Sequence, residues 1–141
     1  ILSKKTSENM RRVLRLVVEN GTGRKASAEG YLVGGKTGTA DKQSSTGAYA
    51  KSLRLSSFVA AFPIHKPKFA VLVMVDEPKG NKSSFGYATG GWVAAPAVRR
   101  IIERAAPLLG VLPKDEMSPE IRQILKIDLL EQKRGNRLAS F

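Results

Sequence analysis

The stretch Val33-Gly34-Gly35-Lys36-Thr37-Gly38-Thr39-Ala40 places one lysine and two hydroxyl side chains among glycines. It fits two different structures. In the first, Gly30, four further residues and then Gly35-Lys36-Thr37 form a phosphate-binding loop, in which backbone N–H groups cradle the phosphates and the lysine reaches the terminal one. In the second, Lys36 lies on an extended strand whose rim receives a ligand. The residues on either side decide between the two.

A phosphate-binding loop follows a buried strand and opens a helix. Residues 22–29 contain no β-branched apolar run, and residues 38–47 contain two glycines and no helical apolar period. The apolar run 71–75 ends in Asp76-Glu77, as a magnesium-binding strand does, but Pro78 indicates a turn and a solvated strand end there. The flanks favour the strand, and a nucleotide-binding enzyme is retained as an alternative.

Composition limits the chemistry that the chain can perform. The 141 residues are 42% hydrophobic, which is enough for one domain with a moderate core. There is no cysteine, so thiol catalysis, disulfides and cysteine-bound zinc are excluded, and no metal or cofactor is expected. The single histidine, His65, lies in the Pro- and Lys-rich stretch 63–68 and is expected in a solvated turn. A Ser-His-Asp triad is therefore not expected, and acyl transfer would depend on lysine.

The formal net charge of +12 raises the question of nucleic-acid binding. The basic residues are scattered through the chain, and no block of Lys or Arg exceeds a pair. This distribution favours a solvated surface, or general attraction to anionic envelope polymers, and no specific nucleic-acid partner is expected. A basic binding module without catalysis is retained as a third alternative.

The first element predicted by hydrophobic periodicity is a helix capped at Thr6 or Ser7. Four apolar residues recur at helical spacing and are expected to form one buried stripe. They are Met10, Val13, Leu14 and Val17. Asn20-Gly21 ends the helix, because both residues accept the left-handed conformation that closes a helix end.

Three strands and a second long helix follow. One strand surrounds Lys36, residues 56–62 place apolar side chains on one face, and residues 69–75 are apolar on both faces, as in an interior strand covered on each side. The segment 94–108 has helical periodicity, with Pro96 tolerated in its first turn. The fold class predicted is α+β, an antiparallel sheet of about three strands packed by N- and C-terminal helices.

Beyond Pro113 the sequence changes character. Ser118-Pro119 supplies a cap and a first-turn proline for one short amphipathic helix. Its apolar stripe comprises Ile121, Ile124, Leu125 and Leu129. We expect residues 114–141 to form a C-terminal extension whose helix docks on its own domain, with a frayed end at 135–141.

A wider pattern surrounds Lys36. Lys-Thr-Gly is one of three motifs of penicillin-binding proteins and serine β-lactamases. It stands in order with Gly21-Thr22-Gly23, Gly30-Tyr31, Ser57-Phe58-Val59, Val75-Asp76-Glu77-Pro78 and Gly90-Gly91-Trp92-Val93-Ala94-Ala95-Pro96. Together these resemble the C-terminal part of the transpeptidase domain of class B penicillin-binding proteins, most closely the septal, cell-division type. The resemblance covers about 6–113, so residues 1–113 are expected to be part of a β-lactamase/transpeptidase-like domain.

The resemblance implies a peptidoglycan D,D-transpeptidase that cross-links stem peptides and binds β-lactams. In that family a serine attacks the penultimate D-Ala carbonyl, expels the terminal D-Ala and passes the acyl group to an amine. By resemblance, the catalytic residues here are Lys36, which sets positive potential and hydrogen-bonds a serine of another motif, and Thr39, whose N–H donates to the oxyanion. The hydroxyls of Thr37 and Thr39 would hold the substrate carboxylate.

Further ligand contacts are expected at Gly38, where the missing Cβ lets a substrate backbone approach the strand edge. Phe85 and Tyr87 are additional candidates for the cleft. The nucleophile is absent, because no Ser-x-x-Lys occurs in the sequence. Ser7-Glu8-Asn9 spells the remaining motif but lies in the first turn of a predicted helix, where capping explains the serine. The chain alone is therefore expected to be inactive and to carry one wall of an active site.

The resemblance also implies partners and a location. We expect stem peptides and β-lactams as ligands, the missing N-terminal part of the domain as a structural partner, and divisome proteins as further partners. A further expected partner is a second copy of the fragment, because an exposed sheet edge favours homodimerisation. The expected location is the periplasm or the outer face of the bacterial inner membrane, with an anchor in a segment outside this chain.

Overall fold

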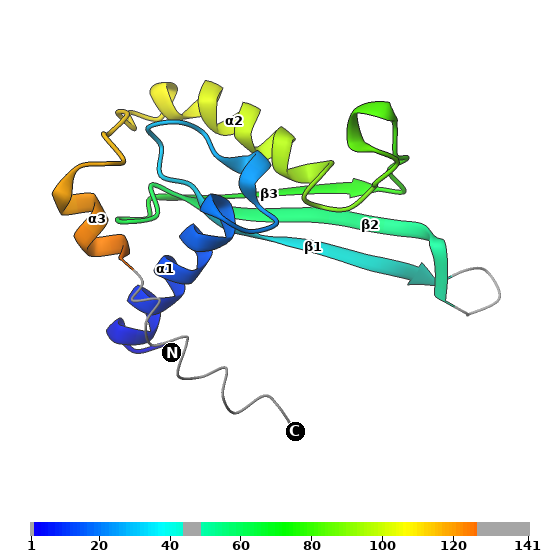
Figure 1. Ribbon diagram of the computed structural model, residues 1–141, viewed down its shortest axis with the longest axis horizontal. Coiled ribbons are helices and arrows are strands. Elements are labelled where there is room, and N and C mark those ends of the chain that lie inside the picture. Colours follow the sequence, from blue (N-terminus) through cyan, green and yellow to red (C-terminus); the bar gives the residue numbers. More distant parts are fainter. Residues whose placement is uncertain (1, 44–48, 127–141) are drawn as a thin grey trace.

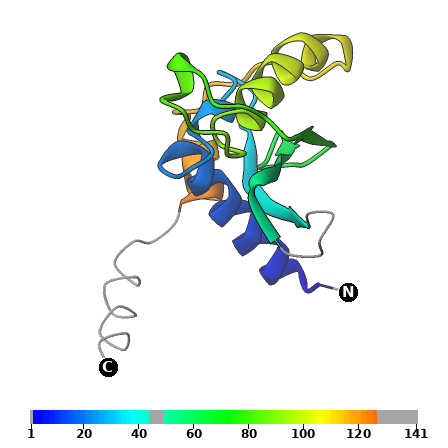
Figure 2. The ribbon, with the colours of Figure 1, turned by 90° about the vertical axis from the view of Figure 1, so that its right-hand side faces the viewer.

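The computed structural model describes residues 2–43 and 49–126. The elements, in order, are α1 (Lys4–Glu19), η1 (Arg24–Ala26), β1 (Gly34–Gln43), β2 (Tyr49–Phe62), β3 (Phe69–Asp76), η2 (Lys82–Ser84), α2 (Ala94–Leu108) and α3 (Pro119–Leu125). The strands form an antiparallel sheet in the order β1-β2-β3. Helix α2 lies above the strands and α1 below them (Figure 1, Figure 2). This confirms the α+β class predicted from the sequence.

Strand β2 supplies the centre of the core, because alternate side chains of a strand point to the same face. The β2 residues buried on the face covered by α2 are Ser56, Phe58, Ala60 and Phe62. The α2 residues that are buried against the sheet are Ala94, Ala95, Val98, Ile102 and Ala106. Full burial of one phenylalanine stabilises a fold by about 1.5–3 kcal/mol, so Phe58 and Phe62 anchor this layer.

Strand β3 differs from the prediction that both of its faces are covered. Its burial alternates, and Leu72 and Met74 are 60% and 55% exposed on the face away from α2. Val59 of β2, paired with Leu72, is 48% exposed on the same face. The prediction was wrong for the described residues because an apolar run does not specify how many layers cover it.

The buried side of α1 also differs from the prediction. The helix is capped by Ser3, whose hydroxyl accepts a hydrogen bond of 3.1 Å from a first-turn N–H, rather than by Thr6 or Ser7. Met10 and Val13 are 47% and 50% exposed, and the buried residues of α1 are Arg15 and Val18. The prediction of the buried stripe failed here because the spacing of apolar residues gives no sign that an arginine lies on the face packed against the sheet.

Arg15 is buried because its charge and its N–H groups are satisfied by partners in three segments: α1, the residue before β1 and the turn before α3. Its Nε lies 2.7 Å from Oε1 of Glu19, and its Nη1 donates to the carbonyl of Val33 at 3.1 Å. Its Nη2 pairs with Glu116, whose other carboxylate oxygen accepts the N–H of Gly30 at 2.9 Å. This group of residues, the Arg15 cluster, ties α1 and the C-terminal segment to the start of β1.

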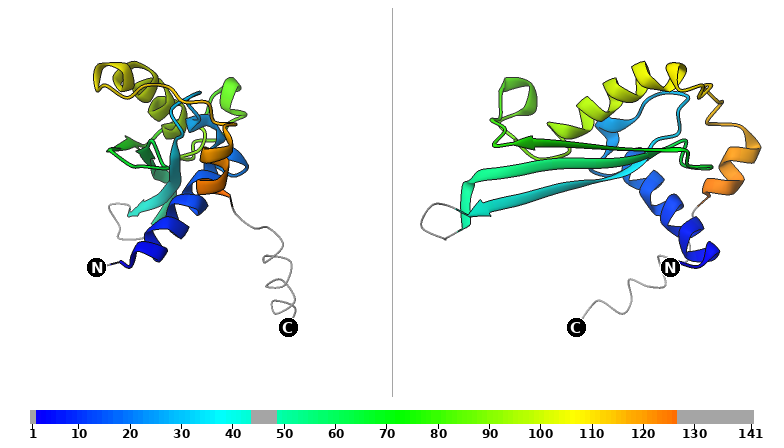
Figure 3. Two further views of the ribbon diagram at one scale, coloured as in Figure 1. Left: turned by 90° about the vertical axis from the view of Figure 1, so that its left-hand side faces the viewer. Right: turned by 180° about the vertical axis from the view of Figure 1, so that it is seen from behind.

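Helix α3 docks on the domain that carries it, as predicted. The hydroxyl of Ser118 accepts a hydrogen bond from the N–H of Ile121 and so caps the helix. Ile121 packs with Leu32 and Ile64 in a second buried cluster. Figure 3 shows α3 near the end of the sheet where β1 begins. Leu129 and the end expected at 135–141 lie outside the described residues, and the domain division at residue 113 stays a prediction. None of the described helices is both apolar enough and long enough to cross a bilayer.

His65 does lie in the turn between β2 and β3, but its side chain is not simply solvated. It is half-buried, and its Nδ1 is enclosed without a hydrogen-bond partner. Burial lowers the pKa of His65, and the positive charge of Lys114 lowers it further. The prediction that His65 is solvated was therefore wrong, because the C-terminal segment packs beside its side chain.

Candidate active site

Lys36 lies in the edge strand β1, opposite Val59 of β2. A phosphate-binding loop would place this lysine before the N-terminus of a helix. Here the strand continues to Gln43. The nucleotide-binding alternative is therefore wrong, and the interpretation of this segment as a strand is confirmed.

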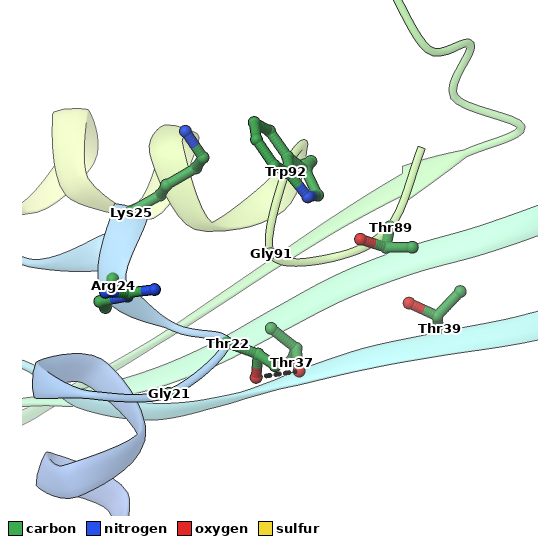
Figure 4. A pocket seen from close by; sticks show the side chains of 9 residues that line it. All are labelled: Gly21, Thr22, Arg24, Lys25, Thr37, Thr39, Thr89, Gly91 and Trp92. Atoms are coloured by element: carbon green, nitrogen blue, oxygen red, sulfur yellow. Dashed lines mark hydrogen bonds between the residues drawn. The ribbon is translucent and has the colours of Figure 1, made fainter. Parts of the chain in front are cut away.

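A cleft of about 630 Å³ lies along one face of β1 (Figure 4). Three segments build it: β1, the turn and short helix η1 that follow α1, and the loop that leads into α2. Its lining residues are Gly21, Thr22, Arg24, Lys25, Thr37, Thr39, Thr89, Gly91 and Trp92. Among these described residues there is no carboxylate, whereas two are cationic and four carry hydroxyls, so the cleft suits an anionic, hydrogen-bonding ligand.

Thr37 and Thr39 are the two predicted site residues that the structure brings together in the cleft. They are two positions apart on a strand, so both side chains point to the same face. The hydroxyl oxygen of Thr37 lies 3.1 Å from that of Thr22, and the hydroxyl of Thr39 accepts the N–H of Gly90 at 3.2 Å. These contacts fix both hydroxyls at the floor of the cleft (Figure 4).

Gly90 and Gly91 allow the loop before α2 to lie directly on the sheet. A Cβ at Gly90 would collide with the carbonyl oxygens of Ser57 and Gly38, and a Cβ at Gly91 would lie 2.6 Å from the carbonyl oxygen of Thr22. Both contacts are to backbone, which cannot move aside as a side chain can. The Gly-Gly pair therefore closes one side of the cleft.

Lys36 does not line the cleft, because adjacent residues of a strand face opposite sides. Its side chain is exposed, and its ammonium donates to the carbonyl of Thr37 at 2.9 Å and to the hydroxyl of Thr37 at 3.3 Å. The lysine thus curls around the free edge of β1 toward the row of threonines. Its charge lies at the rim of the cleft.

The glycines beside Lys36 serve the fold in ways that the sequence did not reveal. A Cβ at Gly34 would collide with Ile64, and a Cβ at Gly35 with Phe58 and with the carbonyl oxygen of Val59. Both glycines therefore leave room for side chains and backbone of the core.

Gly38 faces a different neighbour. A Cβ there would lie 2.5 Å from the hydroxyl of Ser57, on the face opposite the cleft. Because that hydroxyl can rotate away, the fold tolerates a small side chain at this position better than at Gly35. A role for Gly38 in substrate approach stays a prediction.

Phe85 and Tyr87, the additional candidates, do not line the cleft. They are 77% and 56% exposed and contact Trp92, which does line it. Phe85 meets the Trp92 ring edge-on at 5.6 Å between centroids, and Tyr87 stacks on it at 5.9 Å. Sequence reasoning overlooked Trp92 as a site residue, although the Gly90-Gly91-Trp92 run was part of the recognised pattern.

Arg24, Lys25 and Thr89 were also overlooked as site residues. Nothing in their spacing signals a site, because they come from η1 and from the loop before α2, which only the folded chain brings beside β1. Thr22, in contrast, belongs to the Gly21-Thr22-Gly23 motif, so its presence in the cleft could have been anticipated.

Asp76 and Glu77 play no part in the cleft. Both carboxylates bind Lys42, at 2.8 and 2.7 Å from its ammonium nitrogen. The hydrogen bond that Lys42 donates to Asp76, and then the one that it donates to Glu77, raises the pKa of Lys42. The interpretation of these carboxylates as a solvated strand end is confirmed.

Comparison with known proteins agrees with this arrangement. Residues 1–103 match the family described as penicillin binding protein transpeptidase domain. The chain is 48% identical over 125 residues to the probable peptidoglycan D,D-transpeptidase FtsI of Caulobacter vibrioides, covering 83% of this chain and 21% of that protein. It is 44% identical over 114 residues to stage V sporulation protein D of Bacillus subtilis, covering 81% and 17% respectively.

Solved structures show the same fold. Penicillin binding protein 3 of Mycobacterium tuberculosis, complexed with ampicillin, superposes with a TM-score of 0.71 at 26% identity, over 85% of this chain and 27% of that one. The transpeptidase domain of Burkholderia pseudomallei penicillin-binding protein 3 gives 0.68 at 36% identity, over 81% and 33%. The chain spans about a fifth of the length of the two curated relatives. By its matched residues and its fold, this chain belongs to the penicillin-binding protein transpeptidase domain family.

Proposed function

We propose that the chain forms one wall of the active site of a septal peptidoglycan D,D-transpeptidase that is also acylated by β-lactams. The observation that carries the proposal is the pairing of Thr37 and Thr39 in a cleft with cations and without carboxylates, beside the free edge of β1. A peptide that ends in a carboxylate fits such a wall, because hydroxyl donors and positive potential both favour its charge.

In the proposed reaction, a serine supplied by a part of the protein outside the printed sequence attacks the penultimate D-Ala carbonyl of a stem peptide. The tetrahedral intermediate carries an oxyanion, to which the N–H of Thr39 donates. The C–N bond to the terminal D-Ala then breaks, the leaving amine takes a proton, and the acyl-enzyme passes to an amine of a second strand. Losing one oxyanion donor typically lowers turnover by about 10²–10³.

Lys36 acts at the rim in this proposal. Its ammonium reaches the carbonyl and hydroxyl of Thr37 around the strand edge, and in the proposal it hydrogen-bonds a serine hydroxyl supplied by the remainder of the domain. There it stabilises negative charge and helps to relay a proton. Such proton transfer contributes roughly 10²-fold or more to an enzyme's rate.

The location and partners follow from the same proposal. Cross-linking takes place where peptidoglycan lies, so the wall formed by this chain faces the periplasm, at the outer face of the inner membrane, with the anchor outside the printed sequence. The remainder of the domain completes the cleft, and divisome proteins direct the enzyme to the septum. Activity then requires both parts, and the chain alone is inactive.

A fluorescent penicillin tests the proposal. We expect no covalent labelling of the isolated 141-residue chain and rapid labelling of the complete protein. In the complete protein, Lys36→Ala should lower the labelling rate by roughly 10²-fold. Lys42→Ala is the matched control, because Lys42 lies on the same strand but binds Asp76 and Glu77 at the strand end.

Labelling of the isolated chain, or unchanged labelling of the Lys36→Ala protein, would contradict the proposal. Circular dichroism of each variant shows whether a lost signal reflects lost fold. Thr37→Val, which preserves shape and removes one hydroxyl of the cleft, gives an independent check on ligand binding.

A further inference from the structure

Two cations lie at one end of the cleft. Arg24 and Lys25, both in η1, line the same space as Thr37 and Thr39, and both are exposed. Figure 4 shows both residues on the segment that follows α1, above the row of threonine hydroxyls, with the Lys25 side chain extending toward Trp92. The cleft thus has a hydroxyl floor along β1 and a separate cationic end at η1.

Lys25 is held in place without being neutralised. Its ammonium nitrogen lies 4.2 Å from the centroid of the Trp92 ring. A cation above an aromatic face gains about 0.5–1 kcal/mol at an exposed site, and the contact leaves the positive charge intact. Trp92 is itself braced by Phe85 and Tyr87. The ammonium is therefore positioned in advance of any ligand.

Lys42 and Arg99, two cations outside the cleft, are neutralised by nearby acids, whereas others such as Lys68 make no ion pair among the described residues. Lys42 binds Asp76 and Glu77, and Arg99 binds Glu103 at 2.7 Å. Within residues 2–43 and 49–126, neither Arg24 nor Lys25 makes an ion pair. Positive charge that is positioned at a cleft and lacks an internal partner attracts an anionic ligand group.

We propose that Arg24 and Lys25 bind a second anionic group of the acyl donor, distinct from the terminal carboxylate held by Thr37 and Thr39. The substrate class is then a stem peptide that carries a free side-chain carboxylate in addition to its C-terminal one. This inference rests on the proposed function, because it assigns a substrate to the same cleft. An amidated side chain gains nothing from the two cations, so the enzyme discriminates by charge.

A pair of penicillins tests the inference on the complete protein. One carries a phenylacetyl side chain, and the other is its analogue with an added carboxylate on the side-chain α-carbon. The readout is the ratio of their second-order acylation rate constants, dianionic over monoanionic. Lys25→Gln and Arg24→Gln should each lower this ratio by about two- to fivefold, the range of an exposed ion pair. Lys25→Arg, which keeps the charge and the stacking on Trp92, should restore it.

The matched control is Lys68→Gln, which removes one exposed lysine in the turn before β3, away from the cleft. Its ratio should equal that of the wild type. Raising the salt concentration to about 0.5 M should lower the wild-type ratio toward those of the Lys25→Gln and Arg24→Gln variants, because salt screens exposed charges.

An unchanged ratio in both Gln variants would overturn the inference. So would an equal fall in both rate constants, because the cations would then serve the carboxylate that the two penicillins share. Either result would contradict only this inference and would leave the proposed function standing. If the wild-type protein is acylated by neither penicillin, it is the proposed function that fails.

Discussion

The start and the middle of strand β1 lie a few residues apart and are built for different purposes. At the start, Arg15 donates to the carbonyl of Val33, and Gly34 and Gly35 admit core side chains. In the middle, Thr37 and Thr39 face a cleft with two cations that have no acidic partner among the described residues. Charge at the start is neutralised within the chain, and charge at the middle is left for a ligand.

This contrast explains how one edge strand can be both stable and exposed. An edge strand presents unpaired backbone groups and needs firm attachment elsewhere. The Arg15 cluster joins α1, the start of β1 and the C-terminal segment. The anchored start holds the threonines in register, so the hydroxyls of the cleft need little reorganisation when a ligand binds.

The largest effect is expected at Arg15. Arg15→Met leaves Glu116 and the carbonyl of Val33 without their buried partner, and breaking a buried ion pair costs about 3–5 kcal/mol. We expect a loss near 3 kcal/mol in the free energy of unfolding, because Glu116 keeps some contact with water. Urea denaturation of the 141-residue chain measures it.

Arg99→Met is the matched control for this experiment. Arg99 and Glu103 form the same i,i+4 pair, at the same 2.7 Å, as Arg15 and Glu19, but on the surface. Loss of the Arg99–Glu103 pair should lower the free energy of unfolding by no more than about 0.5 kcal/mol. Equal costs for the two variants would show that the Arg15 cluster does not anchor the strand.

A smaller effect separates two glycines of β1. Gly35→Ala forces a Cβ against the Phe58 ring and the carbonyl of Val59 and should destabilise the chain by about 1–3 kcal/mol. Gly38→Ala meets only the rotatable hydroxyl of Ser57 and should cost less than about 1 kcal/mol. Thermal unfolding of both variants measures the two losses of stability. A larger loss for Gly38→Ala than for Gly35→Ala would contradict the distinction between the start and the middle of β1.

Thr37→Val tests the middle of the strand. The substitution preserves shape and β-propensity but removes the hydroxyl that contacts Thr22. We expect the acylation rate of the complete protein to fall by roughly tenfold, which is the worth of about one hydrogen bond to a charged group. The free energy of unfolding should change by less than about 1 kcal/mol. A large loss of stability with unchanged acylation would place Thr37 among the anchoring residues.

The smallest effect concerns pH and the turn beside the start of β1. Burial lowers the pKa of folded His65 below its ordinary 6.5. The unfolded chain therefore binds the proton more readily, and stability falls as the pH drops through about 6.5 toward the folded pKa. Urea midpoints at about pH 7.5 and 5.5 should differ in this direction. His65→Gln should reduce this difference between the two urea midpoints. If the difference is unchanged in the variant, groups other than His65 cause it.

Several features could be predicted from local sequence. Glycines and hydroxyls around Lys36, without an apolar strand before or a helical period after, indicated a strand, and the structure places Lys36 in β1. The periodicity of 94–108 predicted a helix whose buried residues include Val98 and Ile102. The order of motifs indicated the family. These features depend on near neighbours in the chain, whose physical chemistry acts over one or two turns.

Other features depended on contacts between distant segments. Arg15 is buried because Glu116, a hundred and one residues later, meets it. The apolar residues of β3 divide into a covered and an exposed face because α2 lies on only one side. Lys25, in η1, and Trp92, in the loop before α2, meet only in the folded chain. The sequence by itself determined the elements and the chemistry of the β1 rim, whereas tertiary structure decided which charges are neutralised and which face a ligand, because burial and pairing arise only when remote segments pack together.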